Sequence, residues 1–474
     1  MAVGVKSGAA RDNVSSDNGR RKSVDTACNR LNDFAPHLSS KHGLTKFQKC
    51  TLIVISFVLL ASFIIGSETF MSLIQTVLIL GFSLNIALRL LAIFLSILQS
   101  APPKSDELVD DDLPTVTILA PMYKEAEVVG QSIEALSRTA YPAHKLQILY
   151  LLEEDDIETI SAFKELKSDL DFQVLIVPHA APRTKPKALN YGLQFARGEF
   201  VCVFDAEDWP GPNQIRRAVQ TFKSGAPELA VIQAPLFTHN RKDSWLAAQF
   251  ELEYALHFGL WLPMISKLNW PIPLGGTSNY FRRSHLETVH AWDPYNVTED
   301  ADLGYRLARA GFKSALICEP TLEEAPLSLT QWVPQRTRWI KGHLQTLIVL
   351  LRAPGLLVQE LGIWRTLGLF STFGGSVAAS AIHGPALLIM LLGLLTDTIT
   401  LGWMHWAVCL SGYFSVAMSA VAIGSIRQRV FQLATVPFYW PLQSYAFLCA
   451  LWELRTKPHI WSKTRHGLSR YLPA

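Results

Sequence analysis

Three carboxylates follow a short apolar run near the middle of this 474-residue chain. Residues 200–204 are apolar, and Asp205, Glu207 and Asp208 come directly after them. An apolar run of this length that ends in charge is typical of a buried parallel strand, and open α/β sheets bind ligands at the carboxyl ends of such strands. Hard oxygen ligands favour Mg²⁺ or Mn²⁺, which in turn bind phosphates. The pattern predicts a divalent metal site on these three side chains, with a solvated acidic turn as the simpler alternative.

Two earlier strand ends also carry polar side chains. Tyr123 and Glu125 follow the first apolar run, and Glu153 opens the acidic run at 153–156 after the second. An aromatic ring beside a carboxylate at a strand end can hold a flat base and a ribose hydroxyl. A helix start with Glu near its dipole, or an ordinary acidic loop, explains the same residues.

Lys185 and Lys187 stand at the start of an expected helix. Helix N-termini favour anions, so cations there are locally unfavourable unless an anion such as a diphosphate binds beside them. A solvated lysine pair is the alternative.

A third acidic group, Glu299 and Asp300, begins another expected helix after Thr298. Thr298 can cap that helix with the carboxylates behind it, which is a complete structural explanation. The functional interpretation makes Asp300 a general base aimed at an acceptor hydroxyl.

Gln335, Arg338 and Trp339 share one face of a later helix, at positions i, i+3 and i+4. A flat aromatic ring suits the apolar face of a sugar, and an Arg beside it suits a phosphate or a developing negative charge. The alternative is a helix that places Arg and Trp at a bilayer surface.

The elements that position these groups follow an alternating pattern. Strands are expected at 116–120, 147–152, 173–177, 200–204 and 229–233, and helices at 128–139, 157–167, 187–197 and 213–223. Alternation of this kind predicts βαβ units and a parallel sheet with helices on both faces.

Apolar segments flank this region on both sides. Four segments are expected to span a membrane, at 51–66, 72–98, 367–395 and 401–423. The apolar segment at 430–452 contains two prolines and precedes a basic tail, which favours an interfacial or re-entrant segment over a fifth span. The expected organisation is a disordered basic leader at 1–49, two transmembrane helices within 50–98, a linker at 99–113, an α/β domain at 114–345, a membrane region at 346–452 and a basic cytoplasmic tail at 453–474.

Composition sets limits on the class of protein. A hydrophobic content of 49% with a mean hydropathy of +0.20 indicates a mixed membrane and soluble protein. The net charge of +3 is too small to favour nucleic acid as a partner. The cysteines are scattered, with no CxxC pair, which predicts reduced thiols and a reducing compartment around the soluble part.

The order of these motifs resembles one known family. PMYKE, EEDD, KPKALN, DAED, GGTSN, TED and QRTRW occur in this order between about 114 and 342. This series resembles the family 2 glycosyltransferases, and more narrowly the membrane-embedded processive β-glycan synthases, the group of cellulose, chitin, hyaluronan and poly-N-acetylglucosamine synthases. The resemblance implies an α/β GT-A (Rossmann-like) cytosolic domain plus an α-helical transmembrane region.

The resemblance also implies roles for single residues. Asp205 matches the first acid of the metal-binding DxD pair, and the second acid falls on Glu207 with Asp208 as an extra carboxylate. Asp300 matches the general base of the TED motif, beside Glu299. The remaining residues implied to bind substrate are Tyr123, Glu125, Glu153, Lys185, Gly276 and Thr277 of the acceptor-side loop, and Gln335, Arg338 and Trp339.

The implied reaction is an inverting hexosyl transfer that uses Mg²⁺ or Mn²⁺. A UDP-sugar, UDP-glucose or UDP-N-acetylglucosamine, is the expected donor, and the end of a growing β-linked polysaccharide is the expected acceptor. The expected location is the plasma (inner) membrane, multi-pass, with the catalytic domain cytoplasmic and with membrane lipid and polysaccharide-export proteins as partners. The alternatives are transfer of one sugar to a polyprenyl phosphate or other lipid, and a non-catalytic membrane partner.

Overall fold

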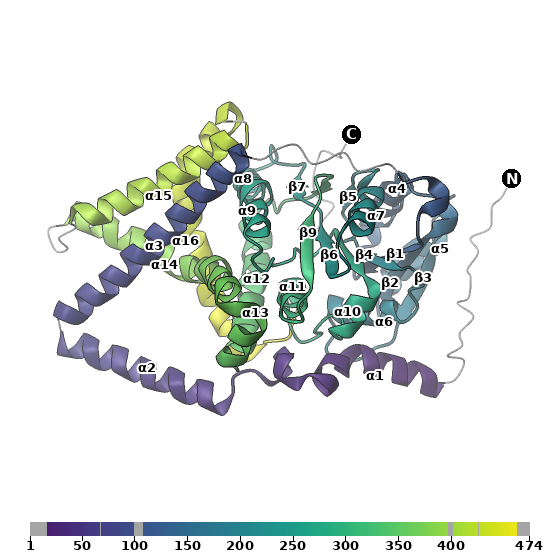
Figure 1. The fold of residues 1–474 in the computed structure, drawn as a ribbon, viewed down its shortest axis with the longest axis horizontal. Coiled ribbons are helices and arrows are strands. Elements are labelled where there is room, and N and C mark those ends of the chain that lie inside the picture. Colours follow the sequence, from purple (N-terminus) through teal and green to yellow (C-terminus); the bar gives the residue numbers. More distant parts are fainter. Residues whose placement is uncertain (1–16, 67, 99–107, 397–401, 425, 462–474) are drawn as a thin grey trace.

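The computed structural model describes residues 17–66, 68–98, 108–396, 402–424 and 426–461. Figure 1 shows a β-sheet domain on one side of the molecule and long apolar helices on the other. The expected fold class, an α/β domain joined to a helical region, is confirmed.

Seven strands form the main sheet in the order β3-β2-β1-β4-β8-β6-β9. Their bounds are β1 Val116–Met122, β2 Leu146–Glu153, β3 Gln173–Val177, β4 Phe200–Val203, β6 Leu229–Gln233, β8 Asn279–Arg282 and β9 Lys313–Leu316. The five strands expected from the sequence are confirmed. These five strands run parallel to one another, as expected, but the sheet also contains β8, which the sequence did not predict and which runs antiparallel to both β4 and β6. β8 and β9 are short and partly polar, so no apolar run marks them in the sequence.

Helices cover both faces of the sheet because successive strand residues point to opposite sides. In β1, Ile118 packs in the layer that contains α4 (Val129–Ser137) and α7 (Gln214–Ser224), whereas Leu119 packs in the layer that contains α6 (Lys185–Leu193). The expected helices are present as α4, α5 (Ile157–Glu165), α6 and α7. The sheet therefore has a buried core on each face, and its strand ends are held rigidly.

A second, small sheet lies beyond the acidic run. It contains β5 (Trp209–Pro210), β10 (Thr321–Glu323) and β7 (Leu236–Thr238), in the order β5-β10-β7. The connecting helices that follow are α8 (Trp245–Leu256), a π-helical turn η6 (His257–Trp261), α9 (Leu262–Lys267), α10 (Arg283–Thr288), α11 (Glu299–Arg309) and α12 (Leu329–Leu350).

The expectation of a disordered leader is wrong for its described part. Residues Asp17–Phe34 form helix α1, which buries Ala27, Cys28 and Leu31 almost completely. Asn190 of α6 donates a hydrogen bond to the carbonyl of Ala27 at 3.0 Å. The three buried residues form a narrow apolar stripe at helical spacing, which the polar average composition of the leader hides. Residues 1–16 lie outside the described part of the chain.

Four helices in the described part are long and apolar enough to cross a membrane. They are α2 (Lys46–Ile65), α3 (Glu68–Ile97), the pair α13–α14 (Pro354–Leu369 and Gly375–Leu395, joined by η7, Phe370–Gly374, and kinked at Gly362) and α15 (Trp403–Ala422). Most of their apolar side chains face outward, as in α2, whose most apolar window has no buried residue. Such exposed apolar surface is typical of segments that contact lipid.

The last helix, α16 (Ile426–Thr456), is not among these four. It runs without interruption through Pro437 and Pro441 and packs along α12 and α14. The re-entrant form of the sequence expectation is therefore wrong, and the interfacial form stays a prediction. Residues 99–107 of the expected linker and 462–474 of the expected tail lie outside the described residues.

Candidate active site

The antiparallel pairing of β4 with β8 brings two of the motifs together. Val203 pairs with Asn279, so the acidic run after β4 lies beside the GGTSN segment before β8. The Thr277 hydroxyl donates to Asp208 Oδ2, and the backbone N–H of Asp205 donates to the same oxygen at 2.7 Å. The main chain at Asp205 is thus fixed at the end of the strand.

Lys185, the first residue of α6, reaches the same strand end. Its ammonium group forms an ion pair with Asp205 and donates to the carbonyl oxygen of Gly276 at 2.8 Å. Burial alone lowers the pKa of Lys185, but the nearby carboxylates, Asp205 first and then Glu299, raise it above its usual value. Lys185 therefore remains a cation at the centre of the site.

The start of α11 carries Glu299 and Asp300 into this group. A Cβ atom at Gly276 would lie 3.2 Å from Asp300 Oδ2 and 3.9 Å from Lys185 Nζ, so the backbone of Gly276 lies directly beside both side chains. The Asp300 carboxylate also accepts a hydrogen bond from the backbone N–H of Ala301 at 2.7 Å. A side chain at position 276 would fill the space between the acid and the cation.

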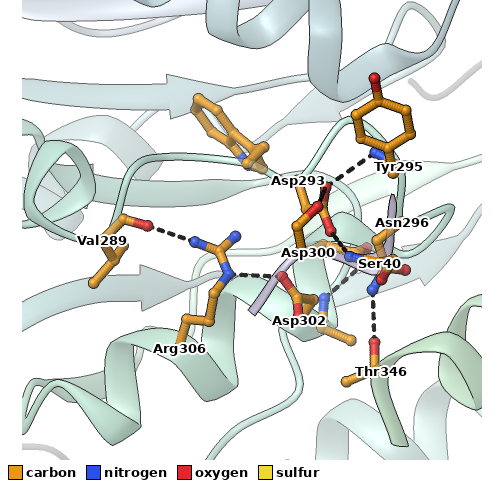
Figure 2. Close-up of polar contacts among 12 residues, drawn as sticks. Ser40, Val289, Asp293, Tyr295, Asn296, Asp300, Asp302, Arg306 and Thr346 are labelled. Atoms are coloured by element: carbon orange, nitrogen blue, oxygen red, sulfur yellow. Dashed lines mark hydrogen bonds and ion pairs between the residues drawn. The ribbon is translucent and has the colours of Figure 1, made fainter. Parts of the chain in front are cut away.

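Figure 2 shows the polar contacts that hold the segment before and within α11. Asp293 accepts hydrogen bonds from the backbone N–H of Ser40 at 2.6 Å and of Tyr295 at 3.1 Å. Within α11, Arg306 pairs with Asp302 at 2.7 Å. The leader segment after α1 therefore supports the loop that leads to Asp300.

Helix α12 brings Arg338 close to the same carboxylates, and Gln335 is buried on the same helix. A Cβ at Gly342 would come within 2.3 Å of Thr298 Oγ1, so only glycine permits the close approach of α12 to the start of α11. Burial lowers the pKa of Arg338, and the carboxylates of Glu299 and Asp300 oppose that shift. The guanidinium lies 4.3 Å from the ring centroid of Trp461.

The two acids of the TED motif titrate differently. Burial raises the pKa of Asp300 to about 6, while the backbone hydrogen bond from Ala301 and the cations Lys185 and Arg338 limit the shift. Burial and the adjacent Asp300 raise the pKa of Glu299 to about 8. Asp300 is therefore the more readily ionised of the two acids, which is the arrangement expected for a base beside a neutral acid.

Several buried polar atoms at the site lack a hydrogen-bond partner among the described residues. They are Asp208 Oδ1, Glu299 Oε2, Gln335 Oε1 and Arg338 Nε. Buried polar groups are normally paired, so these four atoms have hydrogen-bonding capacity that a polar ligand can use.

Tyr123 and Glu125 lie at the end of β1, as expected. The guanidinium of Arg183 stacks over the Tyr123 ring, 4.9 Å from its centroid, and pairs with Asp155. A carboxylate oxygen of Glu125 accepts from the backbone N–H of Tyr123 at 3.3 Å. The acidic run after β2 thus contributes Asp155, which the sequence did not single out.

Two of the residues expected to bind substrate face inward instead. Glu153 is almost fully buried and pairs with the buried Lys187 at 2.6 Å, underneath the strand end. Thr277 is likewise buried, and its hydroxyl is used by Asp208. The sequence identifies the segments correctly, but it does not show which way these side chains point.

Trp339 lies in a cluster of aromatic rings beside the site. It stacks with Tyr254 of α8 at a centroid distance of 6.2 Å and contacts Phe250 at 5.9 Å. Arg336 lies over the Trp339 ring at 4.5 Å and donates two hydrogen bonds to Glu253, at 2.6 and 2.7 Å. The orientation of Trp339 is therefore fixed by a salt bridge that the sequence motif does not reveal.

The oxygen ligands expected to bind a metal form a mutually repelling group. Burial, Asp205 and Glu207 raise the pKa of Asp208 well above its usual range. Glu323, at the end of β10, joins this group: burial and Glu207 raise its pKa to about 8. No ready-made metal cluster of three His, Cys, Asp or Glu side chains occurs in the described part of the chain. The hard oxygens and the unpaired Asp208 Oδ1 nevertheless suit a divalent cation.

Glu323 is the acidic residue that the sequence analysis missed. It is the last residue of a three-residue strand and is followed by Glu324, so no long apolar run marks this strand end. A three-strand sheet, formed from segments far apart in the chain, carries it to the acidic group.

The sheet, its acidic strand ends and the cationic helix face define a glycosyltransferase domain of the GT-A type. Residues 114–342 match the model of the family described as "Glycosyltransferase like family 2". The expected class of enzyme is confirmed for this domain.

Two known proteins illustrate the match. A Bacillus subtilis (strain 168) protein, "Probable glycosyltransferase YdaM", is 26% identical over 239 residues, which are 49% of this chain and 56% of that protein. The chain thus spans little more than half the length of this curated relative. The mannosyltransferase PcManGT from Pyrobaculum calidifontis, solved in complex with GDP-Man and Mn²⁺, superposes with a TM-score of 0.52 at 19% identity. That likeness covers 80% of this chain and 98% of PcManGT, and it shows the fold.

Proposed function

We propose that this protein is a membrane glycosyltransferase that moves one hexose at a time from a nucleotide sugar to the end of a β-linked glycan, with inversion at the anomeric carbon. The observation that carries the proposal is the placement of Asp300. Its carboxylate lies beside Gly276, with the cations Lys185 and Arg338 and the first acid of the metal motif, Asp205, around it.

Asp300 acts as the general base. The acceptor hydroxyl gives its proton to the Asp300 carboxylate, and its oxygen forms a bond to the anomeric carbon. The bond from that carbon to the diphosphate breaks, and its electron pair leaves with the phosphate oxygen. A pKa of about 6 keeps Asp300 ionised at neutral pH and close to the operating pH, which is where a general base works best.

Lys185, Gln335 and Arg338 bind the diphosphate that departs. Lys185 pairs with Asp205 and exchanges that partner for the donor phosphates. Arg338 has an unpaired, buried Nε and keeps its charge in water-poor surroundings, so it stabilises the negative charge that develops on the leaving group. The amide of Gln335 supplies a further polar contact.

A divalent ion, Mg²⁺ or Mn²⁺, would be held by Asp205 and Glu207, with Asp208 fixing the turn between them and Glu323 adding negative charge. The ion supplies charge neutralisation for the donor diphosphate. Two observations support this proposal. The clustered carboxylates repel one another, and PcManGT, which has a similar fold, was solved in complex with Mn²⁺.

Tyr123 and Glu125 bind the nucleoside part of the donor. The Tyr123 ring already stacks against Arg183, so a base can extend this stack. The Glu125 carboxylate lies beside the backbone of Tyr123, where it can accept a hydrogen bond from a ribose hydroxyl. UDP-glucose or UDP-N-acetylglucosamine is the donor that the motifs favour, and GDP-mannose enters the test because PcManGT was solved with it.

Trp339 provides the surface for the acceptor sugar. Its ring is held by Tyr254 and Arg336 at the side of the group that contains Asp300. The QRTRW motif resembles that of processive synthases, which favours a polymer end as acceptor and an exported product, with the catalytic domain on the cytoplasmic side of the plasma membrane. Transfer to a lipid acceptor is the competing function.

The test is incorporation from UDP-glucose, UDP-N-acetylglucosamine and GDP-mannose by membranes that contain the full chain, with and without Mn²⁺ or Mg²⁺. We expect metal-dependent polymer from one donor, and none from Asp300→Asn. A lipid-soluble product that carries one sugar would show that the acceptor is a lipid and not the end of a glycan. Undiminished activity in Asp300→Asn overturns the assignment of the base.

A further inference from the structure

An arginine inside the helical region has no partner in the described part of the chain. Arg89 lies on α3, and Asn85 lies one turn before it on the same face. Arg89 is partly buried and desolvated, yet it makes no hydrogen bond or ion pair with any described residue. A cation near the end of a membrane span can extend its side chain to the membrane surface, but Arg89 is desolvated by burial.

The surroundings of Arg89 come from three helices. His383 of α14 lies close enough to Arg89 for the two groups to interact electrostatically. The His383 ring stacks on Trp440 of α16 at 5.3 Å and contacts the edge of Phe82 of α3 at 5.4 Å. The Asn85 amide lies against Gly375, since a Cβ there would be 3.3 Å from Asn85 Nδ2. His383, which interacts with Arg89, thus lies between the Trp440 and Phe82 rings, and Asn85 adds an amide one turn from Arg89 on the same helix.

No carboxylate is positioned to neutralise it within the described parts of the four membrane-span candidates. Their carboxylates are Glu68 and Glu360. Glu360 pairs with Arg309 at 2.5 Å. Glu68 opens α3, about 31 Å away along the helix at the usual rise per residue. An uncompensated cation among apolar helices is costly, so such residues normally mark a binding site.

The depth of Arg89 matches that of lipid phosphates. One turn beyond it, Ala92 and Ile93 pack against the cytosolic domain, and Lys267 of α9 donates to the carbonyl of Leu95 at 2.8 Å. Arg89 is about 12 Å from the C-terminal end of α3. We place Arg89 at the level where the hydrocarbon layer of a bilayer meets the lipid headgroups. A phosphate is the anion found at this level.

We infer that Asn85, Arg89 and His383 form a binding site for the phosphate of an anionic lipid, whose chain lies along Phe82 and Trp440. The aromatic rings beside the donors favour a lipid over a free phosphate, because they offer apolar contact that inorganic phosphate does not use. This site is separate from the group around Asp300, and it does not depend on which sugar is transferred.

The test uses the full-length protein in an uncharged detergent and measures thermal unfolding with three additives. Dioleoyl phosphatidic acid supplies phosphate and chains, dioleoylglycerol supplies the chains alone, and inorganic phosphate supplies the anion alone. We expect stabilisation by phosphatidic acid only. Arg89→Gln should weaken its apparent affinity at least about tenfold, the usual effect of losing a charged hydrogen bond. Arg365→Gln, which removes an arginine of α13 that contacts a backbone carbonyl, should leave it unchanged.

A second readout separates binding from a structural role. Without lipid, Arg89→Gln should be at least as stable as the unmodified chain, because it removes an uncompensated cation; Arg89→Lys should retain part of the lipid effect. Lower stability of Arg89→Gln without lipid, together with an intact phosphatidic acid effect, overturns the site. Equal stabilisation by inorganic phosphate or by dioleoylglycerol overturns the lipid assignment. Arg89→Gln should still be stabilised by nucleotide sugar, so this result stands apart from the transferase assignment.

Discussion

Arg336 and Arg338 lie two residues apart on α12, yet they face different regions of the molecule. Arg336 points to the interface of α8 and α16, where Glu253 accepts two of its hydrogen bonds and the Trp339 and Phe250 rings lie against it. Arg338 points to Glu299 and Asp300 but makes no hydrogen bond or ion pair with a described residue, whereas at Arg336 both terminal nitrogens are paired and Nε is not.

The difference shows how one short motif serves two purposes. Where the polar groups of a buried cation are largely paired within the protein, as at Arg336, the contacts maintain the packing of the helices. Where buried charges of both signs are held with incomplete pairing, as around Arg338, the remaining hydrogen-bonding capacity is available to a ligand. The two regions should therefore respond in opposite ways to loss of charge.

The largest effect on activity is expected from Asp300→Asn. Removal of a general base lowers the turnover rate by roughly 10²–10⁴-fold. Thermal stability should not fall, because burial already disfavours the ionised form of Asp300. Asp302→Asn is the matched control: it removes a carboxylate that pairs with Arg306 at 2.7 Å, so it should lower stability while the folded protein stays active. A reversal of these two results would show that the base lies elsewhere.

Arg338→Gln should reduce turnover by roughly 10²–10³-fold, the usual effect of losing one group that stabilises transition-state charge. Its unfolding temperature should stay near that of the unmodified chain, because Arg338 makes no hydrogen bond or ion pair with a described residue. Sugar transfer and thermal unfolding, measured on the same preparation, give the answer. A large loss of stability with normal turnover in the folded fraction would remove the distinction between the two arginines.

Arg336→Gln is expected to act on stability first. It leaves Glu253 without its partner at a mostly buried interface. The free energy of unfolding should fall by about 3 kcal/mol. This is the lower end of the range for buried pairs, because the Glu253 side chain is 37% exposed. Turnover per folded molecule should fall much less than in Arg338→Gln. Denaturation in detergent and activity normalised to folded protein test this. Equal turnover losses in both variants would contradict it.

The sequence predicts well those parts of the site that depend on strand ends. Asp205 and Tyr123 each follow an apolar strand, so their position at one edge of the sheet follows from chain order alone. Lys185 and Asp300 begin helices that the sequence also marks. The structure brings Lys185, Asp205 and Asp300 together, as this pattern predicts.

Side-chain direction and long-range pairing are the features that the sequence does not predict. Glu153 and Lys187 are two members of expected motifs that neutralise each other below the surface, and no local pattern predicts that pair. Glu323 depends on a sheet of three very short strands. Helix α1 has too narrow an apolar stripe to stand out from a polar leader, although it packs on α6 and its connection to α2 supports the loop before Asp300.

The smallest expected change on the catalytic side is that of Glu299→Gln. Glu299 has a pKa of about 8 and is protonated at neutral pH, so glutamine replaces a neutral group by a neutral group and turnover at pH 7 should change only a few-fold. Activity of both proteins should rise with pH through about 6, as Asp300 loses its proton. A pH–rate profile measures both points, and a hundredfold loss in Glu299→Gln would assign the base role to Glu299 instead.

Stability gives an independent check of the same pair. The folded protein holds a proton on Glu299 that the unfolded chain releases near the ordinary value of 4.5. Between about pH 4.5 and 8, the unmodified chain therefore loses stability as pH rises, by up to about 1.4 kcal/mol per pH unit from this group. Glu299→Gln lacks that dependence, so its stability advantage should grow across this window. A constant difference between the two unfolding temperatures from pH 5 to 8 would mean that Glu299 is ionised beside Asp300, and the proposed division into one base and one neutral acid would fail.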